Sequence, residues 1–137
     1  MPNESARRKL MESPEMKEKY DLEYPGYEPD FAAIQNLKSL LRDKKVIIVM
    51  GTWCGDSRLQ VPHFYKVLDE SGVAEKDITL ILVDETKKAE DGLIDNLNID
   101  RVPTFIITSN EKEIGRITEW PLVTLESDMV ELINKNN

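Results

Sequence analysis

The run Val46 to Met50 constrains the fold of this chain more than any other feature. All of its residues are apolar and most are β-branched, a composition typical of strands. Because no polar residue alternates with the apolar ones, both faces of this strand are expected to be buried, as in the centre of a sheet covered by helices. Ile78 to Val83 is a similar run and predicts a second buried strand. The chain is therefore expected to fold as an α/β protein.

The rest of the chain alternates helical and extended patterns. Asp30 is a good helix N-cap, and apolar residues follow it at helical spacing. Helices are expected over four segments: Asp30 to Leu41, Ser57 to Ser71, Thr86 to Leu97, and the C-terminal segment that Thr124 caps. Strands are expected over Phe105 to Thr108 and Glu113 to Ile117, joined by a hairpin turn. This order predicts a central mixed β-sheet sandwiched by helices.

Residues 1–29 differ in composition from the remainder of the chain. They are rich in charged residues, and they also contain tyrosines, prolines and a glycine. A marginal helix is expected over Met1 to Lys19, and an extended, turn-rich segment over Tyr20 to Pro29. The tyrosines either cover part of the fold or belong to a loosely packed surface segment. We therefore divide the chain into a loosely packed N-terminal extension, residues 1–29, and one domain, residues 30–137.

Net charge and cysteine content argue against several classes of function. The net charge of −8 disfavours binding to nucleic acid, which depends on neutralising phosphates. The lone cysteine excludes an intramolecular disulfide and a multi-cysteine zinc site, and its spacing from His63 and the acidic residues is not that of metal ligands. We expect no metal and no cofactor. No apolar run is long enough to span a membrane and no signal peptide is visible, which predicts a cytoplasmic protein without membrane partners.

The segment Trp53-Cys54-Gly55-Asp56-Ser57 carries the strongest functional signal. It directly follows a buried strand and opens a helix, so the thiol of Cys54 lies where the amides of a helix N-terminus stabilise a thiolate. Gly55 lets the backbone of a partner approach closely, whereas the carboxylate of Asp56 opposes ionisation of the thiol. Trp53 is expected to form a platform beside the nucleophile. Ser57 either donates a hydrogen bond to the Cys54 thiolate or simply caps the helix.

Two prolines follow at informative positions. Pro62 lies inside the predicted helix, eight residues after Cys54, and is expected to kink it. Val102-Pro103-Thr104 precedes a strand, and its proline suggests a rigid turn, for which a cis peptide bond is one option. Together with Trp53-Cys54, these residues resemble the thioredoxin family, which has a Trp-Cys-x-x-Cys motif after a central strand, a kinking proline and a cis-proline. The resemblance covers roughly residues 30–137.

The resemblance implies a thioredoxin fold, with Cys54 as the nucleophile and Pro103 in the loop that abuts it and contacts bound peptide. Three positions depart from the family pattern. Ser57 replaces the second cysteine, so the dithiol cycle of the family cannot close within this chain. Ile48 stands where the family has a buried acid that helps to deprotonate that second cysteine. Glu119-Trp120-Pro121 stands where the family often has glycine, which predicts a differently shaped binding edge.

The leading hypothesis is a monothiol redox protein, a thiol–disulfide oxidoreductase but not a dithiol reductase. Cys54 would form mixed disulfides with protein or glutathione-type thiols until an outside thiol releases it. Substrate contacts are expected from six residues: Trp53, Gly55, Asp56, Val102, Pro103 and Thr104. The alternative is a non-catalytic module that grips an extended peptide in the groove between Trp53-Cys54 and Val102-Pro103-Thr104. A third hypothesis is a resemblance to the monothiol glutaredoxins, whose Cys-Gly-x-Ser motif bridges an iron–sulfur cluster with glutathione, but Asp56 replaces their phenylalanine.

Overall fold

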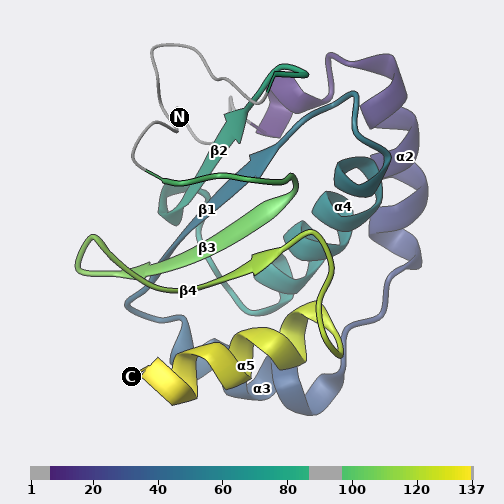
Figure 1. Ribbon diagram of the computed structural model, residues 1–137. Helices are drawn as coiled ribbons and strands as arrows, with labels where there is room; N and C mark the ends of the chain where they lie inside the picture. Colours follow the sequence, from purple (N-terminus) through teal and green to yellow (C-terminus); the bar gives the residue numbers. More distant parts are fainter. Residues whose placement is uncertain (1–6, 87–96, 137) are drawn as a thin grey trace.

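The computed structural model describes residues 7–86 and 97–136 (Figure 1). Within these residues, the sheet has the strand order β2-β1-β3-β4. Its strands are β1 (Lys45–Met50), β2 (Ile78–Leu82), β3 (Thr104–Ser109) and β4 (Lys112–Thr118). β1 pairs in parallel with β2 and antiparallel with β3, and β4 pairs antiparallel with β3. The mixed sheet expected from the sequence is therefore confirmed.

The described helices are α2 (Pro14–Gly26), α3 (Phe31–Leu40), α4 (Gly55–Glu70) and α5 (Leu125–Asn136), and a 3₁₀ turn spans Glu75–Asp77. α2 packs along α4, and α3 packs beside α5, which also contacts β4 (Figure 1). The helices α3, α4 and α5 confirm the predictions from the sequence. The helix expected over Thr86 to Leu97 falls almost wholly outside the described residues. None of the described helices is long and apolar enough to cross a membrane.

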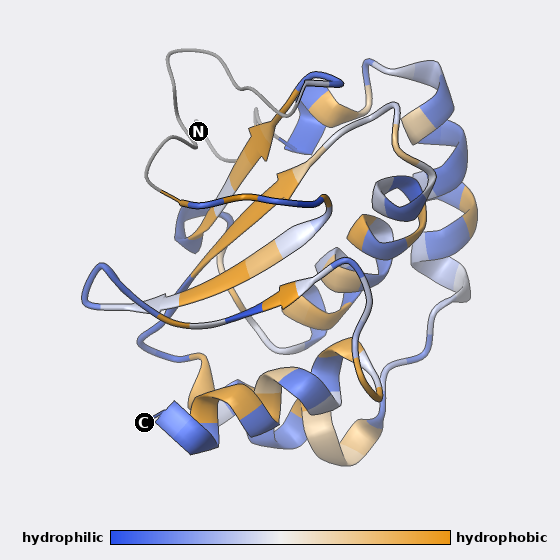
Figure 2. Ribbon diagram, viewed as in Figure 1, coloured by the Kyte–Doolittle hydropathy of each residue, from blue (hydrophilic) through white to orange (hydrophobic). Residues whose placement is uncertain are grey.

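The central strand β1 is buried on both faces, as its composition predicts. Val46, Ile48 and Met50 lie in a core that they share with the helices, and each is at most 1% exposed. Val49 belongs to a second, smaller core, because successive side chains of a strand point to opposite faces. Figure 2 shows β1 and β2 as strongly hydrophobic, whereas α2 is mostly hydrophilic. Alternate residues of one strand thus supply both cores.

The helices α3 and α5 begin where the sequence places their caps. Asp30 precedes α3 and accepts a hydrogen bond from the backbone N–H of Ala33 at 2.9 Å. Thr124 precedes α5, and its hydroxyl accepts a hydrogen bond from the backbone N–H of Ser127 at 3.1 Å. Each side chain satisfies an N–H group that has no partner within its own helix. α4 begins at Gly55, two residues before the predicted start.

The segment before residue 30 differs from the prediction in its secondary structure. Tyr20 to Pro29 is predicted to be extended, but the chain remains helical as far as Gly26. The helix α2 starts after Ser13, whose hydroxyl accepts a hydrogen bond from the backbone N–H of Met16 at 3.4 Å. Pro25 lies in the last turn of α2. The turn-forming residues therefore end a helix rather than build an extended segment.

Residues 7–29 pack closely on the rest of the fold, so for them the expectation of a loosely packed extension is wrong. Met16 is completely buried. Arg7 donates two 2.9 Å hydrogen bonds to the carboxylate of Asp69 on α4, and its guanidinium carbon lies 4.0 Å from the ring centroid of Tyr65. Tyr24 donates a hydrogen bond to the same carboxylate at 2.5 Å. The tyrosines of this segment thus cover part of the fold, which is the other option that the sequence left open.

Candidate functional site

Cys54 lies between the end of the central strand β1 and the start of the helix α4. β1 ends at Met50, and the backbone N–H of Cys54 donates to the carbonyl of Gly51 at 3.1 Å, which closes a tight turn. Cys54 is then the N-cap of α4, because its carbonyl accepts the first hydrogen bond of that helix from the backbone N–H of Arg58 at 3.0 Å. Its side chain is partly exposed. The thiol is therefore accessible at the N-terminus of a helix, as the sequence predicts.

The loop that carries Pro103 meets Cys54 from the other side of the site. The thiol of Cys54 donates to the carbonyl oxygen of Val102, with 3.6 Å between the sulfur and the oxygen. The Val102–Pro103 peptide bond is cis. Thr104 is buried, and its hydroxyl donates to the carbonyl of Arg101 at 2.6 Å, which fixes the loop from within. Tertiary structure thus brings together two motifs that are 48 residues apart.

The indole of Trp53 lines the same groove as Cys54 and is held in place by a hydrogen bond. Its indole Nε1–H donates to the carbonyl of Val83 at 3.0 Å, and its side chain is 37% exposed. The ring lies directly over Gly51, because a Cβ atom at that glycine would come within 2.4 Å of a ring atom. The position of the indole therefore requires a glycine at residue 51. From the sequence, Gly51 is expected only to end the strand.

Ser57 faces the strand end rather than the solvent. Its side chain is completely buried, and its hydroxyl oxygen accepts a hydrogen bond from the backbone N–H of Gly51 at 3.3 Å. Within the described residues its hydroxyl has no hydrogen bond to Cys54. By contrast, a Cβ atom at Gly55 would meet nothing within 4 Å. Apart from its two chain neighbours, Gly55 is therefore bordered by open space.

Sequence reasoning missed Arg58, one helical turn after Cys54. Its guanidinium donates to the carbonyl of Thr52 at 3.0 Å and forms an ion pair with Glu15 of α2 at 3.5 Å. It therefore ties the turn before Cys54 to the N-terminal segment. The spacing of four residues in a helix is the signal that could have identified it.

A groove of about 570 Å³ opens beside the thiol. It is lined by Trp53, Cys54, Glu85, Asp100, Arg101, Val102 and Glu119. Of the predicted site residues, Trp53, Cys54 and Val102 line it, whereas Gly55, Asp56, Ser57, Pro103 and Thr104 are not among its lining residues. The three acidic residues were not predicted, because they come from three separate segments of the chain. The structure therefore adds three carboxylates to the predicted site.

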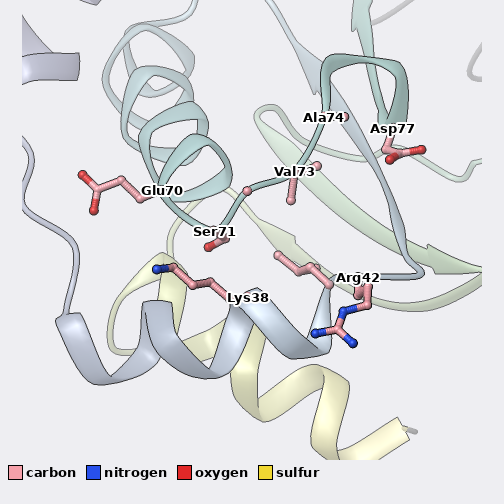
Figure 3. Close-up of a pocket in the computed structure, with 9 residues that line it drawn as sticks. Lys38, Arg42, Glu70, Ser71, Val73, Ala74 and Asp77 are labelled. Atoms are coloured by element: carbon pink, nitrogen blue, oxygen red, sulfur yellow. The ribbon is translucent and has the colours of Figure 1, made fainter.

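A second cavity, of about 390 Å³, lies at the opposite end of α4 from Cys54 (Figure 3). Its side chains include Lys38, Arg42, Glu70 and Asp77, and Ser71, whose hydroxyl has no hydrogen-bond partner among the described residues. No cysteine or histidine lines this cavity. The candidate for covalent chemistry is therefore the groove at Cys54.

Comparison with known proteins gives one family and several similar structures. The family model for thioredoxin matches residues 31–131. A search of curated proteins found no match. A protein of unknown function from Pseudomonas aeruginosa is 17% identical, with 91% of this chain and 81% of that chain covered and a TM-score of 0.55. This likeness shows a shared fold.

Two plant thioredoxins are also similar to this chain. Thioredoxin f from spinach chloroplast is 23% identical, with 73% of this chain and 75% of that chain covered and a TM-score of 0.48. Thioredoxin O2 from Arabidopsis thaliana, in its oxidised state, is 26% identical, with 74% of this chain and 88% of that chain covered and a TM-score of 0.48.

Proposed function

Because this chain belongs to the thioredoxin family, whose model matches residues 31–131, we propose that it exchanges thiols and disulfides through Cys54 alone. The observation that carries this proposal is the 3.6 Å contact between the sulfur of Cys54 and the carbonyl of Val102. Two further observations support it: Cys54 is the N-cap residue of α4, and it lines the groove together with Val102, next to the cis-proline. A disulfide that enters the groove meets the sulfur directly.

The first step is attack of the Cys54 thiolate on one sulfur of a partner disulfide. A new bond forms between Cys54 and that sulfur, the original S–S bond breaks, and the other partner sulfur leaves as a thiolate that takes up a proton. Cys54 is the N-cap of α4 and makes no side-chain capping hydrogen bond. The free amides of the first helical turn are therefore placed to stabilise negative charge on its sulfur.

The second step needs thiols from outside the chain. Ser57 cannot attack the mixed disulfide, because its hydroxyl is a poor nucleophile and is held on the backbone N–H of Gly51. An outside thiolate attacks the sulfur of Cys54 and releases the partner as a dithiol, which leaves the outside thiol bound to Cys54. A second outside thiol then frees Cys54. The sum is one partner disulfide reduced and two outside thiols oxidised to a disulfide.

The proposal is tested by following the mass of the whole chain in the presence of bis(2-hydroxyethyl) disulfide, a small neutral probe. We expect a single adduct on Cys54 that dithiothreitol removes, formed faster than the adduct of the same chain unfolded in urea. The Cys54→Ser variant, which keeps the size and polarity of the side chain, is expected to form none. An adduct that forms more slowly in the folded chain would contradict the proposal, and the groove would then be a peptide-binding surface without turnover.

A further inference from the structure

We propose that the groove at Cys54 selects disulfides that carry positive charge, such as those flanked by lysine or arginine in a protein, over anionic disulfides. This inference rests on the proposed function, because it names the class of partner that reaches the same thiol. The groove has three carboxylates among its lining residues, Glu85, Asp100 and Glu119, which we call the acidic rim. Its only basic lining residue among the described ones is Arg101.

The charge of Arg101 does not balance the acidic rim. Its guanidinium is 69% exposed and pairs with the carboxylate of Glu119 at 3.1 Å. This pair cancels one negative charge and leaves those of Glu85 and Asp100. Glu85 has no ion pair among the described residues. The rim therefore keeps a net negative charge beside the sulfur.

Two arginines that do not line the groove are already engaged. Arg58, one helical turn after Cys54, donates to the carbonyl of Thr52 and pairs with Glu15. Arg116 contributes to the field around Asp100, but it pairs with Glu113 and donates hydrogen bonds to the carbonyls of Leu97 and Asn98. Its guanidinium holds the pKa of Glu113 below its usual value, so this pair is fully charged and internally balanced near neutral pH. By sequence, residues 87–96 contain three acidic residues and two lysines.

Glu119 is placed at the rim by a backbone conformation that is unusual for its residue type. Its φ of 63° lies in the left-handed region, which favours glycine. Its backbone N–H donates to the carbonyl of Pro103 at 2.7 Å, so the same residue closes the loop next to Cys54. A glycine would adopt this conformation more easily but would bring no charge. The side chain of Glu119 thus adds a carboxylate to the groove at a position where the backbone does not require one.

The acidic rim fits an organic cation rather than a metal ion. Within the described residues, no three histidine, cysteine or acidic side chains are grouped as metal ligands. The rim carboxylates are instead spread around a groove of about 570 Å³, which has room for a side chain. Oxidised glutathione carries more carboxylates than ammonium groups and is repelled by such a rim. A disulfide beside lysine or arginine is attracted to it, and that attraction is screened beyond about 10 Å in ordinary buffers.

The test compares three small disulfides with the same reactive bond and different charge. Cystamine carries two positive charges, bis(2-hydroxyethyl) disulfide none, and 3,3′-dithiodipropionate two negative charges. Each rate of adduct formation on Cys54 is divided by the rate at which the same disulfide reacts with N-acetylcysteine amide, a thiol compound without other charged groups. At low ionic strength we expect the normalised rate with cystamine to exceed that with dithiodipropionate about tenfold. The ratio should approach one in about 0.5 M sodium chloride.

Two triple variants with the same change in net charge separate the rim from the overall charge. The rim variant is Glu85→Gln, Asp100→Asn and Glu119→Gln, and we expect it to lose most of the preference for cystamine. The control variant, Glu12→Gln, Glu18→Gln and Glu28→Gln, changes three exposed residues outside the groove, and we expect it to keep the preference.

Each outcome has a distinct meaning. A preference for cystamine that only the rim variant loses supports the inference. Reaction with the neutral probe but no preference for cystamine overturns the inference and leaves the proposed function standing. An equal loss in both triple variants also overturns it, because net charge would then be the cause. Failure of the neutral probe to react faster than with the unfolded chain overturns both proposals.

Discussion

The hydroxyl oxygen of Ser57 accepts a hydrogen bond from the backbone N–H of Gly51 at 3.3 Å. This contact joins the first turn of α4 to the residue that follows β1, and Ser57 is completely buried. The residue that stands in place of a second cysteine therefore supports the turn that carries Cys54. Substitutions at Ser57 can separate its contribution to stability from the effect of having no thiol at this position.

Replacing Ser57 by cysteine should restore the chemistry that the chain lacks. Because residue 57 is in the first turn of the helix that Cys54 caps, we expect Ser57→Cys to form an intramolecular disulfide with Cys54. Intact mass should show the loss of two hydrogens on mild oxidation, and insulin reduction by dithiothreitol should accelerate. Ser57→Ala is the control and should show neither effect. It should lower the free energy of unfolding by about 1–3 kcal/mol, because the N–H of Gly51 loses its partner. Two free thiols that persist in oxidised Ser57→Cys would contradict the prediction.

Two glycines of the motif should respond differently to alanine. A Cβ atom at Gly51 would come within 2.4 Å of the Trp53 ring, whereas one at Gly55 would meet nothing within 4 Å. We expect Gly51→Ala to lower the free energy of unfolding by about 1–3 kcal/mol and to displace the indole. Gly55→Ala should leave stability unchanged or slightly higher. Urea unfolding and tryptophan fluorescence measure both effects, in a Trp120→Phe background so that Trp53 is the only fluorophore of its kind. Equal stability of the two variants would show that the ring does not need Gly51.

The N-terminal segment should depend on Arg7. Its guanidinium makes two hydrogen bonds to the carboxylate of Asp69 and lies over the ring of Tyr65. We expect Arg7→Ala to lower the free energy of unfolding by about 1.5–3 kcal/mol, because both charged hydrogen bonds are lost and a partly buried carboxylate loses its counterion. Arg8→Ala removes the same charge from an exposed neighbour and should have little effect. Equal effects of the two substitutions in urea unfolding would argue against a specific role of the pair.

Stability should fall in alkaline solution because of the same cluster. Burial raises the pKa of Tyr20 from 10.0 to about 12. Between these two pH values the folded chain keeps a proton that the unfolded chain releases, so this contribution is complete below pH 10 and is lost as the pH rises to about 12. The loss is about 2–3 kcal/mol at most. Urea midpoints measured across this range should fall less steeply for Tyr20→Phe than for the natural chain. Parallel curves would show that Tyr20 ionises equally in both states.

Several features could be predicted because they depend on residues close in the sequence. The continuous apolar run of β1 requires burial on both faces, and Asp30 and Thr124 provide the caps of α3 and α5. The position of Cys54 between a strand and a helix follows from the same local patterns. The marginal helix predicted as far as Lys19 covers the first part of α2, but its continuation to Gly26 could not be predicted. The sequence of α2 is mostly polar, and its stability depends on contacts with α4.

The amino-acid sequence by itself determined the order of the elements, the mixed sheet, and the presence of one thiol at a helix N-terminus with no second cysteine to resolve it. These properties follow from hydrophobic periodicity, capping and residue identity, which act over a few neighbouring residues. Tertiary structure alone decided that Ser57 bonds to Gly51, and that Glu85, Asp100 and Glu119 gather around Cys54. The Ser57 contact depends on the angle at which α4 leaves β1. The three carboxylates come from distant segments, and folding brings those segments together only when they share a common core.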